Sequence, residues 1–148
     1  MIKLTHAQEQ DISRFIEMES AEDTNEFITP YSLTQHQNEM AKSNVIYLSI
    51  ISGQQVVGFI ILATVNNFVD VEFRRIVVAA KGKGLGQLAI KAMEQYCFKQ
   101  LNSQRIWLDV FKNNERGQYI YKKLGFKVFI PSDKHHGSLT FYQKISNV

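Results

Sequence analysis

A glycine-rich turn between a predicted strand and the most regular amphipathic segment of the chain most constrains its fold. Residues 69–78 are rich in β-branched side chains typical of a strand, and three glycines alternate with other residues over 82–86. The apolar residues around and after this turn recur at the i, i+3, i+4 spacing of one helix face: Leu85, Leu88, Ala89, Ala92, Met93, Tyr96 and Cys97. The sequence therefore predicts a strand, a turn and a helix in direct succession.

This turn has the properties of an anion-binding site. Glycine lets the backbone approach a ligand closely, and the first turn of a helix offers unpaired N–H groups at the positive end of the helix dipole. Lys81 and Lys83 add positive charge at the same place. We therefore expect a phosphate-bearing ligand at this turn.

The rest of the chain alternates between strand and helix patterns. Capping-box spacings that begin at Thr5 and Ser32 predict two helices ending near residues 20 and 43, and Gly125 is placed to end the last helix. Strands are expected at residues 2–4, 45–52 and 56–65 (joined by a hairpin at 53–54), 69–78, 105–110, 126–130 and 139–145. This order of elements predicts an α+β fold with helices packed on a mixed sheet.

Length and composition favour one ordinary globular domain over residues 1–148. Hydrophobic residues make up 45% of the chain and charged residues 21%. The longest apolar run, residues 56–65, is too short to span a bilayer, and the first residues contain no apolar signal core. The single cysteine, Cys97, cannot form an internal disulfide and lies in a helical apolar stripe, so we expect a buried thiol. These features favour a reducing, cytoplasmic setting and no membrane partner.

The net charge of +3 is unevenly divided along the chain. Residues 1–40 contain eight acidic and two basic side chains, so the remaining residues carry a net surplus of nine positive charges. Those basic residues are scattered and form no long run, so no nucleic acid is expected as a partner. An anionic ligand on the basic side with a cationic one on the acidic side explains the division, and solvated faces with no partner explain it equally well.

Two common phosphate-binding motifs fit the glycine turn poorly. A P-loop requires Gly-Lys-Ser/Thr, whereas Gln87 and Leu88 follow Gly86. The dinucleotide pattern G-x-G-x-x-A matches residues 84–89, with Asp109 at the end of the next strand. A dinucleotide-binding fold would need further βα units, however, and only 39 residues follow Asp109.

Two segments resemble motifs of the GNAT superfamily of N-acetyltransferases. Residues 81–86, Lys-Gly-Lys-Gly-Leu-Gly, resemble its acyl-CoA loop Q/R-x-x-G-x-G/A, and residues 114–126 are similar to its N-x-x-A-x-x-x-Y-x-x-x-G-F pattern. Lys81 replaces the usual Arg or Gln, and Gly117 replaces the usual Ala. The resemblance implies a GNAT-like α+β fold, with a mixed, mostly antiparallel central sheet flanked by about four helices.

The resemblance also implies direct transfer of an acetyl group from acetyl-CoA to a primary amine within a ternary complex. The turn into the helix would bind the diphosphate through the N–H groups of Lys83, Gly84, Leu85 and Gly86, beside Lys81. The pantetheine arm would pair with the backbone at Ile76 and Val78. Asn114 would cap its helix and hold the cofactor through its amide.

The reaction needs a base and an acid. An alkyl amine with a pKa of about 10.4 is protonated at neutral pH, so a carboxylate is needed to remove the proton. Glu72 is the first choice for this base and Asp109 the second; either could instead be a strand carboxylate paired with an arginine. Tyr121 occupies the position of the family's thiolate-protonating tyrosine, with a buried packing role as the alternative.

The acceptor is expected to be a primary amine on a small molecule, a peptide N-terminus or a lysine. The acidic residues 1–40 favour a cationic acceptor, and the resemblance implies a homodimer as one expected assembly.

His135 and His136 are adjacent and lack the spacing of a zinc site, so no metal is expected. A non-catalytic acyl-CoA-binding or regulatory module of the same fold is the alternative function. The aromatic residues Phe27, Tyr31 and Tyr47 are assigned to core packing, with the lining of an acceptor pocket as the alternative.

Overall fold

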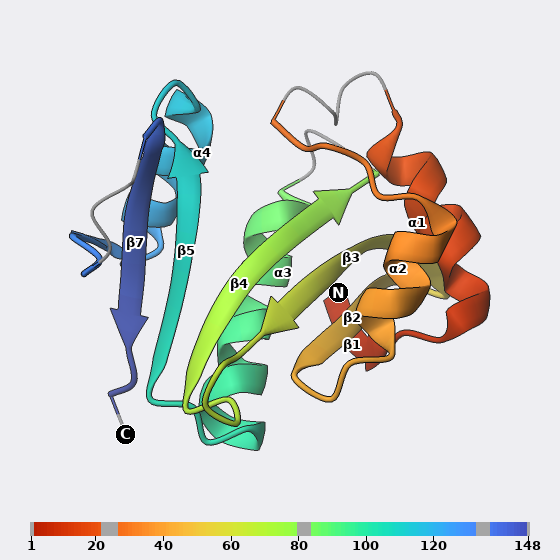
Figure 1. Cartoon of the computed structure of the whole chain (residues 1–148), viewed down its shortest axis with the longest axis horizontal. Helices are drawn as coiled ribbons and strands as arrows, with labels where there is room; N and C mark the ends of the chain where they lie inside the picture. The colour runs from red at the N-terminus through yellow and green to blue at the C-terminus, as the bar shows by residue number, and fades with distance from the viewer. Residues whose placement is uncertain (1, 22–26, 80–83, 133–136, 148) are drawn as a thin grey trace.

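Seven strands form one sheet in the computed structural model, which describes residues 2–21, 27–79, 84–132 and 137–147. The strands are β1 (Ile2–His6), β2 (Val45–Ser52), β3 (Gln55–Ala63), β4 (Asp70–Val78), β5 (Arg105–Phe111), β6 (Lys127–Phe129) and β7 (Leu139–Ile145). Their order across the sheet is β1-β2-β3-β4-β5-β7-β6, and only the β4–β5 pair is parallel (Figure 1). The expected mixed, mostly antiparallel sheet is confirmed.

Four α-helices flank the sheet within the described residues. They are α1 (Ile12–Glu19), α2 (Leu33–Met40), α3 (Leu85–Gln95) and α4 (Glu115–Lys123), with a 3₁₀ turn η1 (Glu9–Asp11) before α1 and a π-helical turn η2 (Tyr96–Gln100) after α3. Figure 1 shows α1 and α2 together on one side of β2–β4 and α3 on the other. The expected number of helices is confirmed.

Local sequence signals place several element ends correctly. Ser32 Oγ accepts a hydrogen bond from Gln35 N at 3.1 Å, and Gln35 Oε1 accepts one from Ser32 N at 2.7 Å, as the capping box at α2 predicts. Gly53, with φ 64°, forms the two-residue hairpin turn between β2 and β3. Gly125 has φ 96° and follows α4 in the predicted left-handed conformation.

Two predicted helix ends are wrong. Thr5 lies inside β1, where it pairs with Ser49, and the capping box before α1 is formed by Gln8 and Asp11. Pairing with β2 extends β1 through His6, and this long-range contact overrides the local capping signal. Helix α2 ends at Met40 rather than near residue 43.

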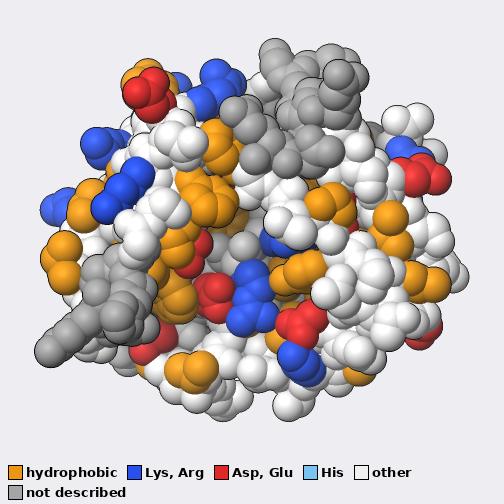
Figure 2. All heavy atoms as spheres, turned by 45° about the horizontal axis from the view of Figure 1, so that its top comes forward, with side chains coloured by type: hydrophobic (Ala, Val, Ile, Leu, Met, Phe, Trp, Pro, Cys, Tyr) orange, Lys and Arg blue, Asp and Glu red, His pale blue; other side chains and the backbone are white. Residues whose placement is uncertain are grey.

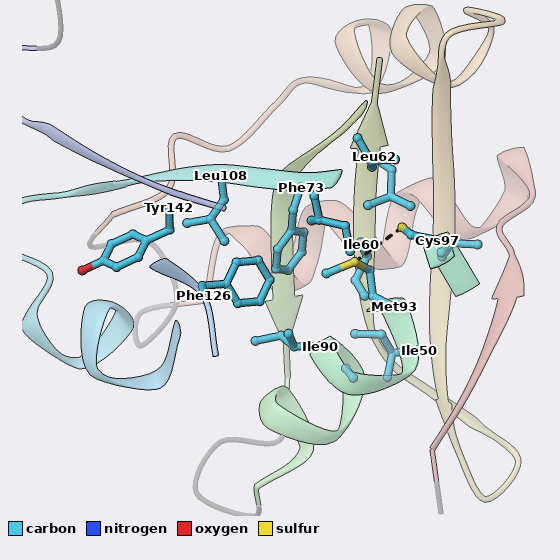
Figure 3. Close-up of a cluster of buried hydrophobic side chains, with 14 of the residues drawn as sticks. Ile50, Ile60, Leu62, Phe73, Ile90, Met93, Cys97, Leu108, Phe126 and Tyr142 are labelled. Atoms are coloured by element: carbon cyan, nitrogen blue, oxygen red, sulfur yellow. Dashed lines mark hydrogen bonds between the residues drawn. The ribbon is translucent and has the colours of Figure 1, made fainter. Parts of the chain in front are cut away.

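Two hydrophobic cores lie on opposite faces of the sheet. The larger one packs α3 and α4 against β2–β5 and β7; its members in Figure 3 are Ile50, Ile60, Leu62, Phe73, Ile90, Met93, Cys97, Leu108, Phe126 and Tyr142. The smaller one packs α1 against Phe59, Ile61 and Val77. The alternation of successive β3 residues between these cores explains why β3 is apolar along both faces.

Cys97 is buried in the larger core, as the sequence predicts. Its Sγ lies 3.7 Å from Met93 Sδ (Figure 3), and burial raises the pKa of the thiol to about 12. A thiol with this pKa stays protonated at neutral pH and is a poor nucleophile.

Strands β4 and β5 diverge after a short pairing. Residues 70–72 of β4 pair with residues 105–107 of β5, and beyond them the strands separate (Figure 1). Pairing between β3 and β4 continues to Val78, but its register shifts between Ile61 and Leu62, which leaves Arg74 as a bulge. The divergence exposes one edge of β4 to the space between the two halves of the sheet.

Within the described part of the chain, no helix is long and apolar enough to cross a bilayer.

Candidate active site

Tyr121 lies on α4 beside the point where β4 and β5 diverge. Asn114 Oδ1 caps this helix by accepting a hydrogen bond from Gly117 N at 2.9 Å. The Tyr121 ring packs edge-on against Phe73 of β4 and Phe126, with ring centroids 6.3 Å and 5.9 Å away. Burial, and secondarily the Asp109 carboxylate, raises the pKa of Tyr121 to about 12. The phenol therefore keeps its proton at neutral pH.

Asp109 projects from β5 on the face opposite the buried residues Leu108 and Val110. Loss of hydration, and then the charge of Glu72, raises the pKa of Asp109. Because Asp109 also raises the pKa of Tyr121, the fold brings Asp109 within electrostatic reach of both Glu72 and Tyr121. No hydrogen bond or ion pair holds Asp109 among the residues that the structure describes.

Glu72 is paired with an arginine. Arg74 Nη2 lies 2.9 Å from Glu72 Oε1, and Arg74 Nη1 lies 3.0 Å from Glu39 Oε1 on α2. Glu39 also forms an ion pair with Lys42. The arginine pairing that the sequence leaves open as an alternative for Glu72 is therefore present.

The glycine turn leads into α3 without a side-chain cap. Gly84 is the N-cap residue with φ 71°, a left-handed conformation that favours glycine, and no side chain of the described residues accepts a hydrogen bond from the first N–H groups. A Cβ added to Gly84 or Gly86 would meet no heavy atom within 4 Å. The N-terminus of α3 is thus open to a ligand at Gly84, Leu85 and Gly86. Lys81 and Lys83, which the sequence predicts to add positive charge at this turn, lie outside the described residues.

Ile76 and Val78 lie on the diverging part of β4. Each pairs with β3 on one side, Ile76 with Ile60 and Val78 with Gly58. On the other side no described residue of β5 pairs with them. An extended, amide-rich chain could therefore add to this edge of β4.

Asn114 has capacity for a second partner. Its Oδ1 is used by the cap, whereas no described residue accepts a hydrogen bond from its Nδ2. A Cβ on Gly117 would lie 2.7 Å from that Nδ2, so glycine here leaves room for the Asn114 amide. The position where the resembled pattern has alanine is therefore explained by close contact with the cap.

A hollow lies between the two halves of the molecule. Figure 2 shows acidic and basic side chains at its floor and hydrophobic side chains along its sides. Among the described residues, Arg74 of β4 forms ion pairs with Glu39 of α2 and with Glu72 of β4. The charge of Glu72 in turn influences Asp109 of β5. No group of three or more His, Cys, Asp or Glu suited to a metal ion occurs in the described ranges.

The sequence reasoning missed a buried polar network next to the hollow. Glu19 and His36 have no exposed surface; Glu19 Oε1 lies 2.7 Å from His36 Nε2, and Tyr47 Oη lies 2.7 Å from His36 Nδ1. Glu19 Oε2 also forms an ion pair with Arg75 of β4, whose guanidinium stacks on Tyr31 at 4.1 Å. These contacts fix α1, α2 and the segment at Tyr31 against β4.

One sequence signal could have identified Glu19. It follows Ile12 by seven residues and Phe15 by four, so it lies on the apolar face of α1. A carboxylate at such a position needs a buried partner. The assignment of Tyr47 to core packing is confirmed, since it is 4% exposed and stacks on Phe59.

Comparison with known families and curated proteins gives a consistent result. The model of the acetyltransferase (GNAT) family matches residues 12–126. A 48-residue segment is 46% identical to spermidine N(1)-acetyltransferase of Escherichia coli K12 and 40% identical to the uncharacterized N-acetyltransferase YdgE of Bacillus subtilis. Each match spans 32% of this chain, but only 26% and 30% of those relatives' lengths.

Solved structures match over nearly the whole chain. Spermidine N-acetyltransferase of Vibrio cholerae in complex with CoA and spermine has a TM-score of 0.80 at 17% identity, covering 97% of this chain and 95% of that one. PaiA N-acetyltransferase of Thermoplasma acidophilum in complex with coenzyme A has a TM-score of 0.77 at 21% identity, covering 99% of both. At these identities the likeness establishes the fold.

Proposed function

Because the chain belongs to the GNAT family of acetyltransferases, we propose that it transfers an acetyl group from acetyl-CoA to a primary amine by direct attack in a ternary complex. One observation carries the proposal: the uncapped N-terminus of α3, the exposed edge of β4 and the Tyr121–Asp109 pair all border the divergence of β4 and β5. We take residues 1–148 to act as one catalytic domain.

The described residues fit the cosubstrate. The N–H groups at Gly84, Leu85 and Gly86 are suited to the diphosphate, because the positive end of α3 stabilises an anion and none of the described side chains occupies this space. The unpaired edge at Ile76 and Val78 is suited to the pantetheine amides. We propose that Lys81 and Lys83 add charge at the diphosphate and that Asn114 donates through Nδ2.

We propose Asp109 as the general base in preference to Glu72. Arg74 donates a hydrogen bond to Glu72, so this carboxylate already has a partner that an incoming ammonium would have to displace. The Asp109 carboxylate has no such partner among the described residues, and its raised pKa makes it a better proton acceptor than an ordinary aspartate. It would accept the proton from the ammonium of the acceptor, either directly or through one water.

Tyr121 is the proposed acid. The reaction breaks the bond between the acetyl carbon and sulfur, and the leaving thiolate takes a proton from the phenol or is stabilised by a hydrogen bond from it. Replacing Tyr121 with Phe is expected to lower kcat by about 10²-fold, with little change in the affinity for acetyl-CoA. Steady-state kinetics with thiol release as the readout measures this.

Tyr119→Phe provides the matched control. Tyr119 lies on the same helix but is 65% exposed, so loss of its hydroxyl is expected to leave kcat unchanged. Equal rates for Tyr121→Phe and the wild-type protein would assign Tyr121 to packing alone.

The glycine turn gives a second prediction. Gly86→Val adds atoms where no other heavy atom lies within 4 Å, so the fold should persist with little change in Tm. The added side chain would stand where the diphosphate approaches, so we expect the Kd for CoA, measured by calorimetry, to rise about tenfold or more. Gly86→Ala, which the resembled loop pattern permits, should cause a much smaller loss. An unchanged Kd in Gly86→Val would place the diphosphate elsewhere.

The proposed acceptor is a cationic amine. The Asp109 carboxylate, which has no ion-pair partner among the described residues, favours positive charge on the acceptor, and proteins of similar fold are spermidine N-acetyltransferases. A screen of amines for thiol release from acetyl-CoA tests this. If no amine supports release while CoA still binds, the chain is the non-catalytic binding module instead.

We also propose a cellular environment and an oligomeric state for the chain. The single buried thiol of Cys97 supports a reducing, cytoplasmic environment. We propose a homodimer or larger homo-oligomer; a dodecameric structure exists for the Vibrio cholerae spermidine N-acetyltransferase. Light scattering on the purified chain measures its assembly state.

A further inference from the structure

We propose that Arg74 is a specificity-determining residue: its guanidinium pairs with both Glu39 and Glu72 and so limits how strongly the hollow binds acceptors carrying more than one positive charge. The inference rests on the proposed function, because it concerns the acceptor side of the same site. Nothing in the family's loop or tyrosine motif involves this residue.

The position of Arg74 follows from the bulge in β4. Ile61 pairs with Arg75 and Leu62 pairs with Phe73, so Arg74 has no partner across the β3–β4 ladder. A bulge redirects a side chain, and this one directs the guanidinium toward α2 rather than into either core. Arg74 therefore joins α2 to β4 through its two ion pairs.

The contacts show that Arg74 neutralises much of the negative charge there. Its two terminal nitrogens lie 3.0 Å from Glu39 Oε1 and 2.9 Å from Glu72 Oε1. The side chain remains 32% exposed, so solvent and ligands can reach it. The hydrogen bond to Glu72 raises the pKa of Arg74 above its already high value, so the positive charge is permanent.

The effect of removing the Arg74 guanidinium follows from the chemistry of its two ion pairs. An ammonium on the acceptor forms the same kind of ion pair with a carboxylate as the guanidinium does, so the two compete for Glu39 and Glu72. Without Arg74, Glu72 loses its arginine partner and Glu39 keeps only the exposed Lys42, so both carboxylates can pair more strongly with a ligand. A diamine can pair with both, whereas a monoamine can pair with only one. Removal of the charge should therefore favour the diamine.

Arg74→Met tests the inference, since methionine keeps an unbranched chain without the charge. The measured quantity is the ratio of affinities for an α,ω-diaminoalkane and the monoamine of the same chain length, by calorimetry at fixed ionic strength. We expect Arg74→Met to raise this ratio about three- to tenfold relative to the wild-type protein, the range of one or two partly exposed ion pairs. The same change is expected in the ratio of kcat/KM values.

Two control variants separate the local effect from net charge. Lys127→Met removes one positive charge from β6 at the far edge of the sheet and should leave the ratio unchanged. Arg74→Lys keeps the charge and should restore the wild-type ratio. Near-UV circular dichroism checks that each variant retains its tertiary packing.

The outcomes are distinguishable from failure of the proposed function. If no amine is acetylated but the affinity ratio rises in Arg74→Met, the proposed reaction is wrong and the inference on charge selection stands. An unchanged or lower ratio in Arg74→Met overturns the inference, whether or not amines are acetylated. Failure of the diamine to bind the variant overturns it as well.

Discussion

Replacing Asp109 with Asn is expected to lower kcat/KM for amine acetylation by about 10²- to 10⁴-fold, the usual contribution of a general base. Asparagine has nearly the same shape but cannot accept the proton of the ammonium group. The affinity for CoA should not change, because Asp109 lies on β5 and not at the N-terminus of α3. Initial rates of thiol release, together with calorimetry for CoA, measure the two effects separately.

The pH dependence gives this prediction a clear sign. Asp109 acts as a base only when ionised, and desolvation with the nearby Glu72 charge raises its pKa. In the wild-type protein kcat/KM should therefore fall as the pH is lowered through that raised pKa, and this acidic fall should be absent in Asp109→Asn. Tyr121, with a pKa of about 12, stays protonated over the same pH range, so its titration does not change kcat/KM near neutral pH.

Glu72→Gln is the matched comparison. Because Glu72 is held by Arg74, we expect a smaller loss of kcat/KM than for Asp109→Asn and a pH profile that keeps its acidic fall. The reverse result, in which Glu72→Gln removes the fall and Asp109→Asn does not, would assign the base to Glu72. Equal profiles in all three proteins would leave proton removal to water.

Replacing Glu19 with Ala is expected to lower the free energy of unfolding by about 3–5 kcal/mol, as for other buried ion pairs that lose one partner. Glu19 is fully buried, and its carboxylate accepts from His36 Nε2, from Arg75 and from Tyr31 N at 3.3 Å. The substitution leaves these donors without their acceptor and leaves the Arg75 charge, 11% exposed, unpaired. Urea unfolding followed by circular dichroism measures the loss.

Glu17→Ala is the control for helix propensity and charge. Glu17 lies on the same helix but is exposed, so its replacement should change the free energy of unfolding by less than about 0.5 kcal/mol. Glu19→Gln, which keeps an acceptor oxygen, should be less destabilising than Glu19→Ala. A loss in Glu19→Ala as small as in Glu17→Ala would show that the buried network contributes little net stability.

Short-range signals in the sequence predicted much of the fold. The Ser32–Gln35 capping box, the hairpin at Gly53 and the helix end at Gly125 depend on hydrogen bonds or backbone conformations within a few residues, and all three occur. The apolar spacing of α3 likewise depends only on helix geometry. The Thr5 cap was wrong because pairing with β2, more than forty residues away, determines the end of β1.

The site was predicted less completely. The motifs identified the turn at Gly84, the cap at Asn114 and the position of Tyr121, because each is defined by spacing along one segment. The motifs did not indicate which of Glu72 and Asp109 has an arginine partner. That pairing depends on the bulge that directs Arg74 toward α2, and the sequence contains no local signal for it.

By itself, the sequence determined the order of the elements and the glycine turn at the start of a helix. It also contains the family's tyrosine motif. All three depend on residues that are neighbours along the chain. The tertiary structure alone decided that Arg74 pairs with Glu39 and Glu72 and that Glu19 is buried with His36 and Arg75. The physical reason is that charge pairing and burial depend on strand register and helix docking, and these are set by contacts between residues far apart in the sequence.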